Sequence, residues 1–344
     1  MTRHDIPLVT PTPKSTGWTG RRVLVTGAGG FIGSHLTEAL AAAGASVRAF
    51  VRYTSRNDHG WLERGDPMLL SEVEIFPGDL ANPEAVANAV NGCDVVFHLG
   101  ALIPIPYSYR HPREFVSANV VGTLNVLEAA RRDGTSRVVH TSTSEVYGTP
   151  ETVPISETHP IRAQSPYAAT KAGADQLALS YKRSFDTPVV IVRPFNTFGP
   201  RQSARAVIPT IVTQALERDA IELGATAPTR DFLYVSDTVQ GIMRCAEVGR
   251  IEGEVINLGT GVEIAVGNVV ERVLGIVGRD LAVTVSGDRL RPVESEVERL
   301  VADCSKAERL LGWTPAVDFD EGLRRTIAWM TGALANYKVT IYNV

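Results

Sequence analysis

The chain has 344 residues, of which 44% are hydrophobic and 21% are charged, with a formal net charge of -4 and a pI near 6.0. This length suits one large or two modest domains, and the acidic balance gives no reason to expect nucleic acid as a partner. The three cysteines are scattered and odd in number, which favours free thiols over disulfides or a metal site. No signal-like or membrane-spanning apolar run stands out, so we expect a cytoplasmic protein without a membrane partner.

Residues 1–20 are polar and proline-rich, and we expect them to form a flexible leader. The first ordered element is the apolar run 22–26, which predicts a strand and leads through a glycine-rich turn into a helical pattern over 34–43. Strand, turn and helix start in this order bring backbone N–H groups against a pyrophosphate, and glycines leave room for its approach. We therefore predict dinucleotide binding here, the alternative being a plain turn. The predicted contacts are Gly27, Gly30, Phe31, Ile32 and Gly33.

Strand and helix patterns then alternate along the chain. Strands are expected at 47–52, 73–76, 95–99, 138–142 and 189–193, with helices at 83–90 and 112–132 among those between them. Such alternation predicts an α/β fold, a Rossmann-type doubly wound parallel sheet with helices on both faces and ligands beyond the carboxyl ends of the strands. Residues that follow these strands are further cofactor candidates: Arg52, Asp79, Leu80, Leu99 and Ala101.

Two of these candidates leave alternatives open. The second predicted strand ends without an acidic residue for a ribose hydroxyl, and Arg52 there suits a ribose 2′-phosphate, which favours NADP over NAD. A solvated arginine at a strand end is the other interpretation, so both cofactors remain candidates. Asp79 is either a partner of the adenine or the cap of its own turn.

A triplet after the fifth predicted strand and a pair in the next helix carry the chemistry. Tyr167 and Lys171 lie four residues apart at the start of a predicted helix over 167–185, so they share one helix face. A nearby ammonium favours the phenolate, which would make Tyr167 a base. A carboxylate beside such a pair suits proton and hydride transfer at a sugar hydroxyl. The predicted catalytic residues are Thr143, Ser144, Glu145, Tyr167 and Lys171.

These motifs resemble the extended short-chain dehydrogenase/reductases of the NAD-dependent epimerase/dehydratase family. The resemblance runs from Arg22 to about Gly332 and includes further stretches at 119–123, 193–201, 230–237 and 257–259. It implies NAD or NADP that stays bound and is recycled in each turnover, with Tyr167 taking the proton of a sugar C4 hydroxyl. Lys171 would hold the nicotinamide ribose and lower the pKa of Tyr167, and Thr143 would bond the same C4 oxygen. Tyr167 and Lys171 thus also count as cofactor contacts.

The same resemblance implies a domain division and an assembly. Residues 21–195 would form mainly the dinucleotide-binding domain and 196–334 mainly a smaller α/β domain that binds the sugar nucleotide, with the chain crossing between them and 335–344 as a tail. The helices at 112–132 and 167–185 match a pair that forms a homodimer interface in this superfamily.

Glu145 distinguishes between the reactions that share a 4-keto intermediate. A carboxylate can remove the C5 proton while an acid assists loss of the C6 hydroxyl, as in 4,6-dehydratases. Dehydratases often carry Thr-Asp-Glu, so Ser144 leaves two options for the C6 proton donor: Glu145 itself, or Ser144 acting through water. A third option is that Glu145 merely orients its neighbours.

Long stretches at 104–109, 199–209, 228–232 and 291–299 resemble the nucleotide-sugar 4,6-dehydratases of legionaminic acid pathways. This implies dehydration of GDP- or UDP-linked N-acetylglucosamine to the 4-keto-6-deoxy sugar. A C4 epimerase, a UDP-glucuronate decarboxylase and a non-catalytic dinucleotide sensor are the alternatives.

The diphosphate of such a substrate needs local positive charge in an acidic protein. Arginines offer bidentate and permanently charged donors, so Arg230 and Arg291 are expected at the diphosphate together with Asn196. Residues in a loop after the fourth strand and in a helix over 207–216 are expected to line the sugar pocket. His98 and His140 are interpreted as packed residues rather than metal ligands. The predicted substrate contacts are Tyr107, Ser108, Asn196, Arg201, Val207, Arg230 and Arg291.

Overall fold

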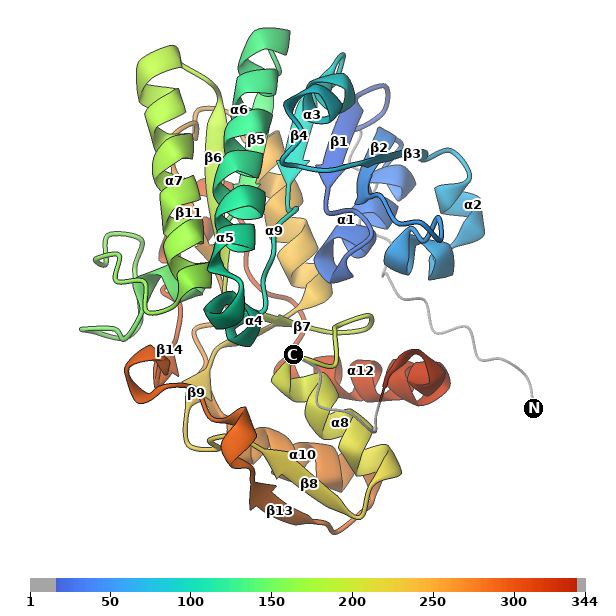
Figure 1. Cartoon of the computed structure of the whole chain (residues 1–344), viewed down its shortest axis with the longest axis vertical. Coiled ribbons are helices and arrows are strands. Elements are labelled where there is room, and N and C mark those ends of the chain that lie inside the picture. The colour runs from blue at the N-terminus through green and yellow to red at the C-terminus, as the bar shows by residue number, and fades with distance from the viewer. Residues whose placement is uncertain (1–16, 339–344) are drawn as a thin grey trace.

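The computed structural model describes residues 17–338 (Figure 1). Its main sheet has seven parallel strands in the order β11-β6-β5-β4-β1-β2-β3. This arrangement confirms the predicted Rossmann-type α/β fold. The strands are β1 (Arg22–Thr26), β2 (Ser46–Arg52), β3 (Glu74–Gly78), β4 (Val95–His98), β5 (Arg137–Thr141), β6 (Val189–Pro194) and β11 (Val255–Leu258).

Helices cover both faces of this sheet, and the strand sequences explain why. Successive residues of a strand point to opposite faces, and here both sets are apolar: Val138 packs into one core and Val139 into the other. Burial on both sides is why the strands read as continuous apolar runs. One face carries α3 (Pro83–Val90), α6 (Gly122–Asp133) and α7 (Pro166–Phe185), and the other carries α1 (Phe31–Ala42) and α9 (Val235–Glu247) (Figure 1).

The predicted elements agree closely with the structure, with a few differences. The expected helix at 112–132 is divided into α5 (Pro112–Phe115), a π-helical segment (Val116–Val121) and α6. The seventh strand, β11, and the helix α9 were not predicted. They belong to the part of the chain after residue 196, which returns to the sheet when β11 pairs with β6.

The predicted leader is wrong for residues 17–20. Trp18 is fully buried, its ring lies 5.8 Å from that of Phe97, and its indole N–H donates to Glu247 Oε1 at 2.6 Å. Long-range packing of one aromatic side chain therefore fixes a segment whose composition indicated flexibility. The rest of the predicted leader, residues 1–16, lies outside the described residues, as do residues 339–344 of the predicted tail.

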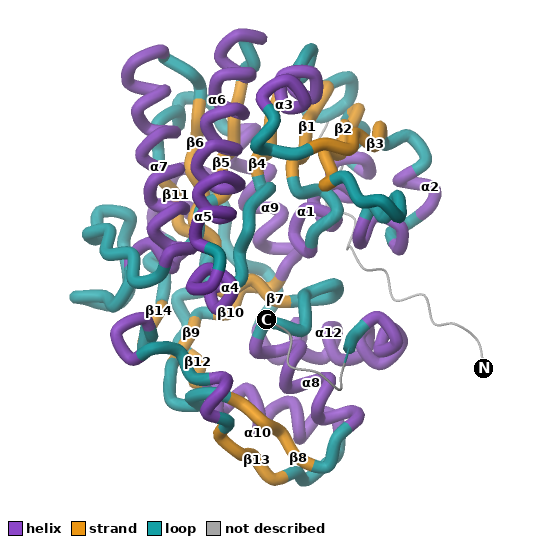
Figure 2. The backbone as a smooth tube through the Cα atoms, in the orientation of Figure 1, coloured by secondary structure: helices purple, strands orange, loops and turns teal. Residues whose placement is uncertain are grey.

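A second and smaller region stands beyond the carboxyl ends of the strands (Figure 2). It combines three small sheets, β10-β7, β12-β9-β14 and β13-β8, with several helices. Its strands are β7 (Asn196–Phe198), β8 (Ala220–Leu223), β9 (Thr229–Arg230), β10 (Phe232–Tyr234), β12 (Ile264–Ala265), β13 (Ala282–Val285) and β14 (Arg299–Leu300). Its helices are α8 (Val207–Glu217), α10 (Val266–Val277) and α12 (Phe319–Ala333), whereas α11 (Ser305–Leu311) packs against β11 and α9 of the main region.

The other short helices of the described chain are η1 (Gly60–Arg64), α2 (Pro67–Leu70), α4 (Ile105–Arg110), η3 (Ser144–Tyr147), η4 (Gly287–Arg289), η5 (Val293–Ser295) and η6 (Leu334–Asn336). Tyr337 then packs on Trp61 and Trp329, and its hydroxyl donates to the carbonyl of Gln202 at 3.0 Å. Among residues 17–338, the helices all lack the combination of length and apolarity that crossing a membrane requires.

Candidate active site

The glycine turn lies where the strand order of the sheet reverses, between β1 and β4. Parallel α/β sheets bind ligands at such a point. Gly27 has a φ of +72°, and a Cβ on it would lie 2.9 Å from the Cα of Gly100 in the loop after β4. A Cβ on Gly33 would lie 2.1 Å from the carbonyl oxygen of Gly27. These two glycines are therefore required by backbone packing, and Gly30, the N-cap of α1, leaves the helix start open to an anion.

The other predicted cofactor residues surround this turn. Thr26 accepts hydrogen bonds from the N–H groups of Leu99 and Gly100 at 3.1 and 3.0 Å, which fixes the loop after β4. Leu80 lies against that loop, since a Cβ on Gly100 would touch its side chain. Asp79 accepts from the N–H of Ala81 at 2.9 Å and so caps its own turn.

Arg52 is exposed at the end of β2 and lines a cavity of about 290 Å³. The cavity connects the nucleotide-binding edge of the sheet with the start of the smaller region, because Ala101, Tyr107 and Arg205 also line it. Arg52 and Arg205 give this cavity two positive charges, and Glu114 adds a negative one.

The predicted catalytic residues lie at the N-termini of two helices, each with a side-chain N-cap. Thr143 caps the turn after β5, where its hydroxyl accepts from the N–H of Glu145 at 3.2 Å. Ser165 caps α7 and accepts from the N–H of Ala168 at 3.1 Å. Tyr167 is in the first turn of α7 and hydrogen-bonds Thr143, so the structure brings the two motifs together.

Lys171 is buried one turn further along α7. Its ammonium donates to the carbonyl of Thr141 at 2.7 Å, and burial lowers its pKa to about 8, while the charge of Asp175 opposes that shift. Burial raises the pKa of Tyr167 above its usual value, and the Thr143 hydrogen bond works against the increase. The predicted lowering of the tyrosine pKa by Lys171 is not a main influence in this structure, because the ammonium is directed at the end of β5.

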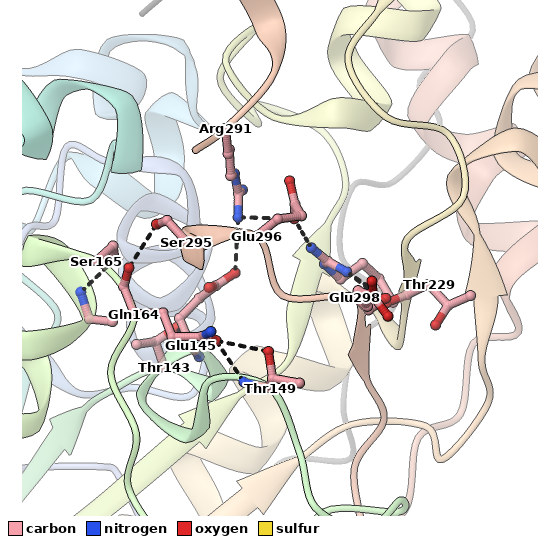
Figure 3. Close-up of polar contacts among 12 residues, drawn as sticks. Thr143, Glu145, Thr149, Gln164, Ser165, Thr229, Arg291, Ser295, Glu296 and Glu298 are labelled. Atoms are coloured by element: carbon pink, nitrogen blue, oxygen red, sulfur yellow. Dashed lines mark hydrogen bonds and ion pairs between the residues drawn. The ribbon is translucent and has the colours of Figure 1, made fainter. Parts of the chain in front are cut away.

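Glu145 faces a chain of alternating charges (Figure 3). Its Oε1 lies 4.0 Å from Nη1 of Arg291, and the same Arg291 nitrogen lies 3.6 Å from Oε1 of Glu296. Nη2 of Arg230 lies 3.1 Å from that Glu296 oxygen. Arg230 and Arg291, which are far apart in sequence, thus meet near Glu145, and Glu296 bridges them.

Ser295 anchors the segment that carries Arg291 and Glu296. Its hydroxyl donates to the carbonyl of Gln164 at 2.7 Å and pairs with the hydroxyl of Tyr109 at 2.5 Å. Sequence reasoning missed Ser295, Gln164 and Glu296. The sequence signal for Glu296 was its position five residues after Arg291, a candidate phosphate ligand.

Tyr107 and Ser108 are not in a loop, as predicted, but in helix α4. Pro106 lies in the first turn of this helix, where proline is tolerated. Ser108 is fully buried and its hydroxyl donates to the carbonyl of Ile105 at 2.7 Å, whereas the Tyr107 hydroxyl donates to Glu114 at 2.8 Å. Ser108 is therefore directed into its own helix.

Three more predicted substrate residues have different environments. Arg201 is fully buried in an ion pair with Glu38 of α1, with Nη1 at 2.8 Å from Oε2, so its charge is already used inside the protein. Asn196 begins β7, and its buried Oδ1 has no hydrogen-bond partner among the described residues. Val207 is the partly exposed first residue of α8.

The two strand histidines are packed inside the sheet, as interpreted from the sequence. His98 pairs with the hydroxyls of Thr26 and Thr123 at 2.8 and 3.0 Å. His140 is fully buried, with Nε2 at 3.2 Å from Oδ1 of Asp175. Burial lowers the pKa of both imidazoles, so both are neutral near pH 7.

The main sheet is parallel and carries a glycine turn at its switch point, and a Thr-Tyr-Lys group lies at the end of β5. These features define an extended short-chain dehydrogenase/reductase of the nucleotide-sugar epimerase/dehydratase class. Comparison with known proteins specifies the family. A model of the GDP-mannose 4,6-dehydratase family matches residues 24–326, and the chain belongs to that family.

Its relatives differ in the reactions that they catalyse. The chain is 34% identical to a dTDP-glucose 4,6-dehydratase of Actinoplanes sp. over 90% of its own length and 97% of that protein. It is also 34% identical to a UDP-glucose 4-epimerase of Mycolicibacterium smegmatis, with 89% and 97% covered. The dTDP-glucose 4,6-dehydratase DesIV of Streptomyces venezuelae, crystallised with NAD, superposes with a TM-score of 0.81 at 31% identity over 92% of this chain and 99% of that one. Family membership thus makes the protein an enzyme acting on sugar nucleotides.

Proposed function

We propose that this protein is a nucleotide-sugar 4,6-dehydratase that converts GDP- or UDP-linked N-acetylglucosamine to the 4-keto-6-deoxy sugar. The observation that carries the proposal is the position of Glu145. Its backbone N–H donates to Thr143, its negative charge acts on Tyr167, and its carboxylate lies 4.0 Å from Arg291. A base in this place is suited to act on the sugar carbon next to the one that is oxidised.

The cofactor would be NAD or NADP, held by the glycine turn between β1 and α1. The backbone packing at Gly27 and Gly33 supports this, because it leaves a concave turn at an open helix start. When bound, the cofactor would supply the hydride acceptor for oxidation at C4 and the hydride donor for reduction at C6. The DesIV structure favours NAD, whereas exposed Arg52 suits the extra phosphate of NADP.

Tyr167 would accept the proton of the C4 hydroxyl as hydride leaves C4, which produces a 4-keto sugar. Thr143 hydrogen-bonds Tyr167, so it can hold the same oxygen of the substrate in line. The ketone makes the C5 proton acidic, and the Glu145 carboxylate then removes it.

Elimination requires that a proton reach the departing C6 hydroxyl. The Glu145 side chain keeps 14% of its surface exposed, whereas Ser144 is buried with 3% exposed. This difference supports Glu145 acting first as base and then as acid, so that C5 loses a proton, C6 loses water and a C5=C6 bond forms. Hydride at C6 and a proton at C5 then complete the methyl group.

Arg291, Arg230 and Asn196 would bind the diphosphate. Arg230 and Arg291 converge on one carboxylate, Glu296, and two guanidinium groups that share one anionic partner are arranged to hold an anion. Asn196 would donate to the diphosphate through Nδ2, whereas its buried Oδ1, which lacks a partner among the described residues, can accept from a hydroxyl or N–H donor of the same ligand. The long stretches at 199–209 and 291–299 are the basis for proposing a substrate of the legionaminic acid pathway type.

The test is to incubate the protein with UDP- and GDP-linked N-acetylglucosamine in deuterated water and to follow the sugar by NMR. A C6 methyl group with deuterium at C5 is the expected product. Inversion at C4 without a methyl group would instead establish an epimerase. Loss of carbon dioxide from UDP-glucuronate would establish a decarboxylase.

Glu145→Gln is the decisive variant, because the amide can neither remove the C5 proton nor protonate the C6 oxygen. We expect methyl formation to fall by about 10²- to 10⁴-fold, the usual contribution of a general acid or base. Binding of the nucleotide sugar should persist. Retained methyl formation in this variant would show that Glu145 only orients its neighbours.

We also propose a homodimer through α6, α7 and the π-helical segment before α6. Val116, Val121 and Phe185 on these elements are 47%, 38% and 54% exposed, although they are large and apolar. Tyr181 of α7 donates to Glu128 of α6 at 2.6 Å, which fixes the two helices as one surface. A molar mass of one chain in light scattering would contradict the dimer.

A further inference from the structure

Asp175 is a buried carboxylate that the proposed chemistry does not use. It lies on α7, one helical turn after Lys171 and two turns after Tyr167, and is fully buried. Residues at these spacings share one helix face. A buried charge is costly unless it is paired, so its position behind the reacting pair calls for a physical reason.

Side chains from two neighbouring strands pair with this carboxylate. The Ser142 hydroxyl donates to its Oδ2 at 2.8 Å, and Arg193 donates to the same oxygen through Nε and Nη2 at 3.1 and 2.8 Å. His140 Nε2 lies 3.2 Å from Oδ1. Burial alone raises the pKa of Asp175, but His140 and Arg193 outweigh it, so its pKa lies below the usual value and the group is ionised.

Lys171 and Asp175 hold consecutive residues at the end of β5. The Lys171 ammonium donates to the carbonyl of Thr141, and Asp175 accepts from the hydroxyl of Ser142. The position of α7 along β5 is therefore fixed at two points one helical turn apart. Tyr167, in the turn before Lys171, takes its position from the same attachment.

The charge of Asp175 also acts on the protonation of Lys171. Burial favours the neutral amine, and Asp175 is the group that raises the pKa of Lys171 against this effect, to about 8. The other charged or titratable groups around Lys171 are His98 from β4, His140 from β5, Arg193 from β6 and Tyr167 from α7. The histidines are neutral near pH 7, and Asp175 supplies the negative charge that acts on Lys171 in this core.

We propose that Asp175 is a positioning residue that keeps Lys171 in its ammonium form and fixes α7 against the end of β5. Its importance for hydride transfer rests on the proposed function, in which Lys171 holds the cofactor. The protonation state of Lys171 is a property of the folded chain and is measured without substrate.

Lysine NMR gives that measurement directly, because the chain has only five lysines. The protein would be labelled with 13C at the lysine ε-carbons, and the Lys171 signal would be assigned by its loss in Lys171→Arg. The wild-type signal should titrate near pH 8. In Asp175→Asn the midpoint should fall by roughly one to three pH units, the effect of removing a buried opposite charge one helical turn away.

Tyr147→Phe is the matched control. It removes a hydroxyl that Arg193 contacts at 2.9 Å but leaves the Asp175 carboxylate in place, so the Lys171 midpoint should stay near pH 8. An unchanged midpoint in Asp175→Asn, or an equal fall in Tyr147→Phe, would overturn the inference.

Asp175→Asn leaves the Arg193 guanidinium without its buried partner, and this alone can prevent folding. The double variant Asp175→Asn/Arg193→Gln removes both charges and carries the test in that case. Its Lys171 midpoint should again lie below that of the wild type, because the carboxylate is still gone. A wild-type midpoint in the folded double variant would contradict the role of Asp175.

The pH dependence of turnover separates this inference from the proposed function. If Lys171 must be charged, the basic limb of kcat/KM moves to lower pH in Asp175→Asn, and activity lost at pH 8 is partly recovered near pH 6. A lowered Lys171 midpoint in a protein that converts no nucleotide sugar would uphold the inference and reject the function. Methyl formation by the wild type, together with a Lys171 midpoint and a basic limb that do not shift in Asp175→Asn, would uphold the function and reject the inference.

Discussion

The two ends of the candidate site treat charge in opposite ways. Beneath Tyr167 and Lys171, the charges of Asp175 and Arg193 are buried and paired at hydrogen-bond distance. At the other end, Arg291 is partly exposed and lies 3.6 to 4.0 Å from two carboxylates. The comparison indicates that hydrogen-bonded pairs fix the side chains of the buried end, whereas Arg291 at the open end has an Nη1 without a hydrogen-bond partner among the described residues and would, in the proposed function, turn to an anionic ligand.

Removal of the Tyr167 hydroxyl tests the buried end and should have the largest effect. Tyr167→Phe deletes the proposed base, so turnover should fall by about 10²- to 10⁴-fold. NMR of the sugar product measures it. Tyr181→Phe is the control on the same helix, since that hydroxyl contacts Glu128 instead, and it should retain turnover. Comparable losses in both variants would show that α7 is merely sensitive to substitution.

A buried ion pair away from the site tests whether burial also determines how much an ion pair contributes to the stability of the fold. Arg201→Ala leaves Glu38 buried and unpaired, so the free energy of unfolding should fall by about 3–5 kcal/mol. Denaturant unfolding measures this. Arg299→Ala, which breaks an exposed pair with Glu263, should change stability little. If the two variants lose the same stability, burial does not set the value of these pairs.

The open end should respond through binding rather than folding. Arg291→Ala removes a charged donor, and we expect the KM for the nucleotide sugar to rise roughly 10- to 100-fold, in line with about 1.5–3 kcal/mol for a hydrogen bond to a charged group. Initial rates at varied substrate concentration measure KM, and a thermal melt should change little. An unaltered KM would remove Arg291 from the diphosphate site and weaken the contrast between the two ends.

Local patterns predicted the elements well, and the structure brings Thr143, Tyr167 and Lys171 together at the end of β5. The turn at Gly27, the strand ends and the Tyr167 and Lys171 spacing are encoded in short stretches, because each depends on neighbours within a few residues. An unbroken run of β-branched apolar residues such as 189–192 favours a buried strand. These features can therefore be predicted without tertiary information.

The errors arose where distant residues decide the outcome. Trp18 is ordered by Phe97 and Glu247, and Arg201 is turned toward Glu38 of α1, so neither position follows from adjacent sequence. The bridging role of Glu296 likewise appears only when segments around Arg230 and Arg291 meet in space. The functions of isolated charged residues are thus the least predictable part of the site.

The return of the chain to the sheet makes the two regions inseparable. In chain order, β11 comes after β7, α8, β8, β9, β10 and α9, and it then pairs with β6 of the main sheet. Helix α9 covers β5 and β6. A protein cut after residue 195 would expose the backbone groups of β6 along an open edge, which favours aggregation. It would also remove Glu247, the partner of Trp18. Limited proteolysis should accordingly fail to release a stable nucleotide-binding fragment that ends at β6.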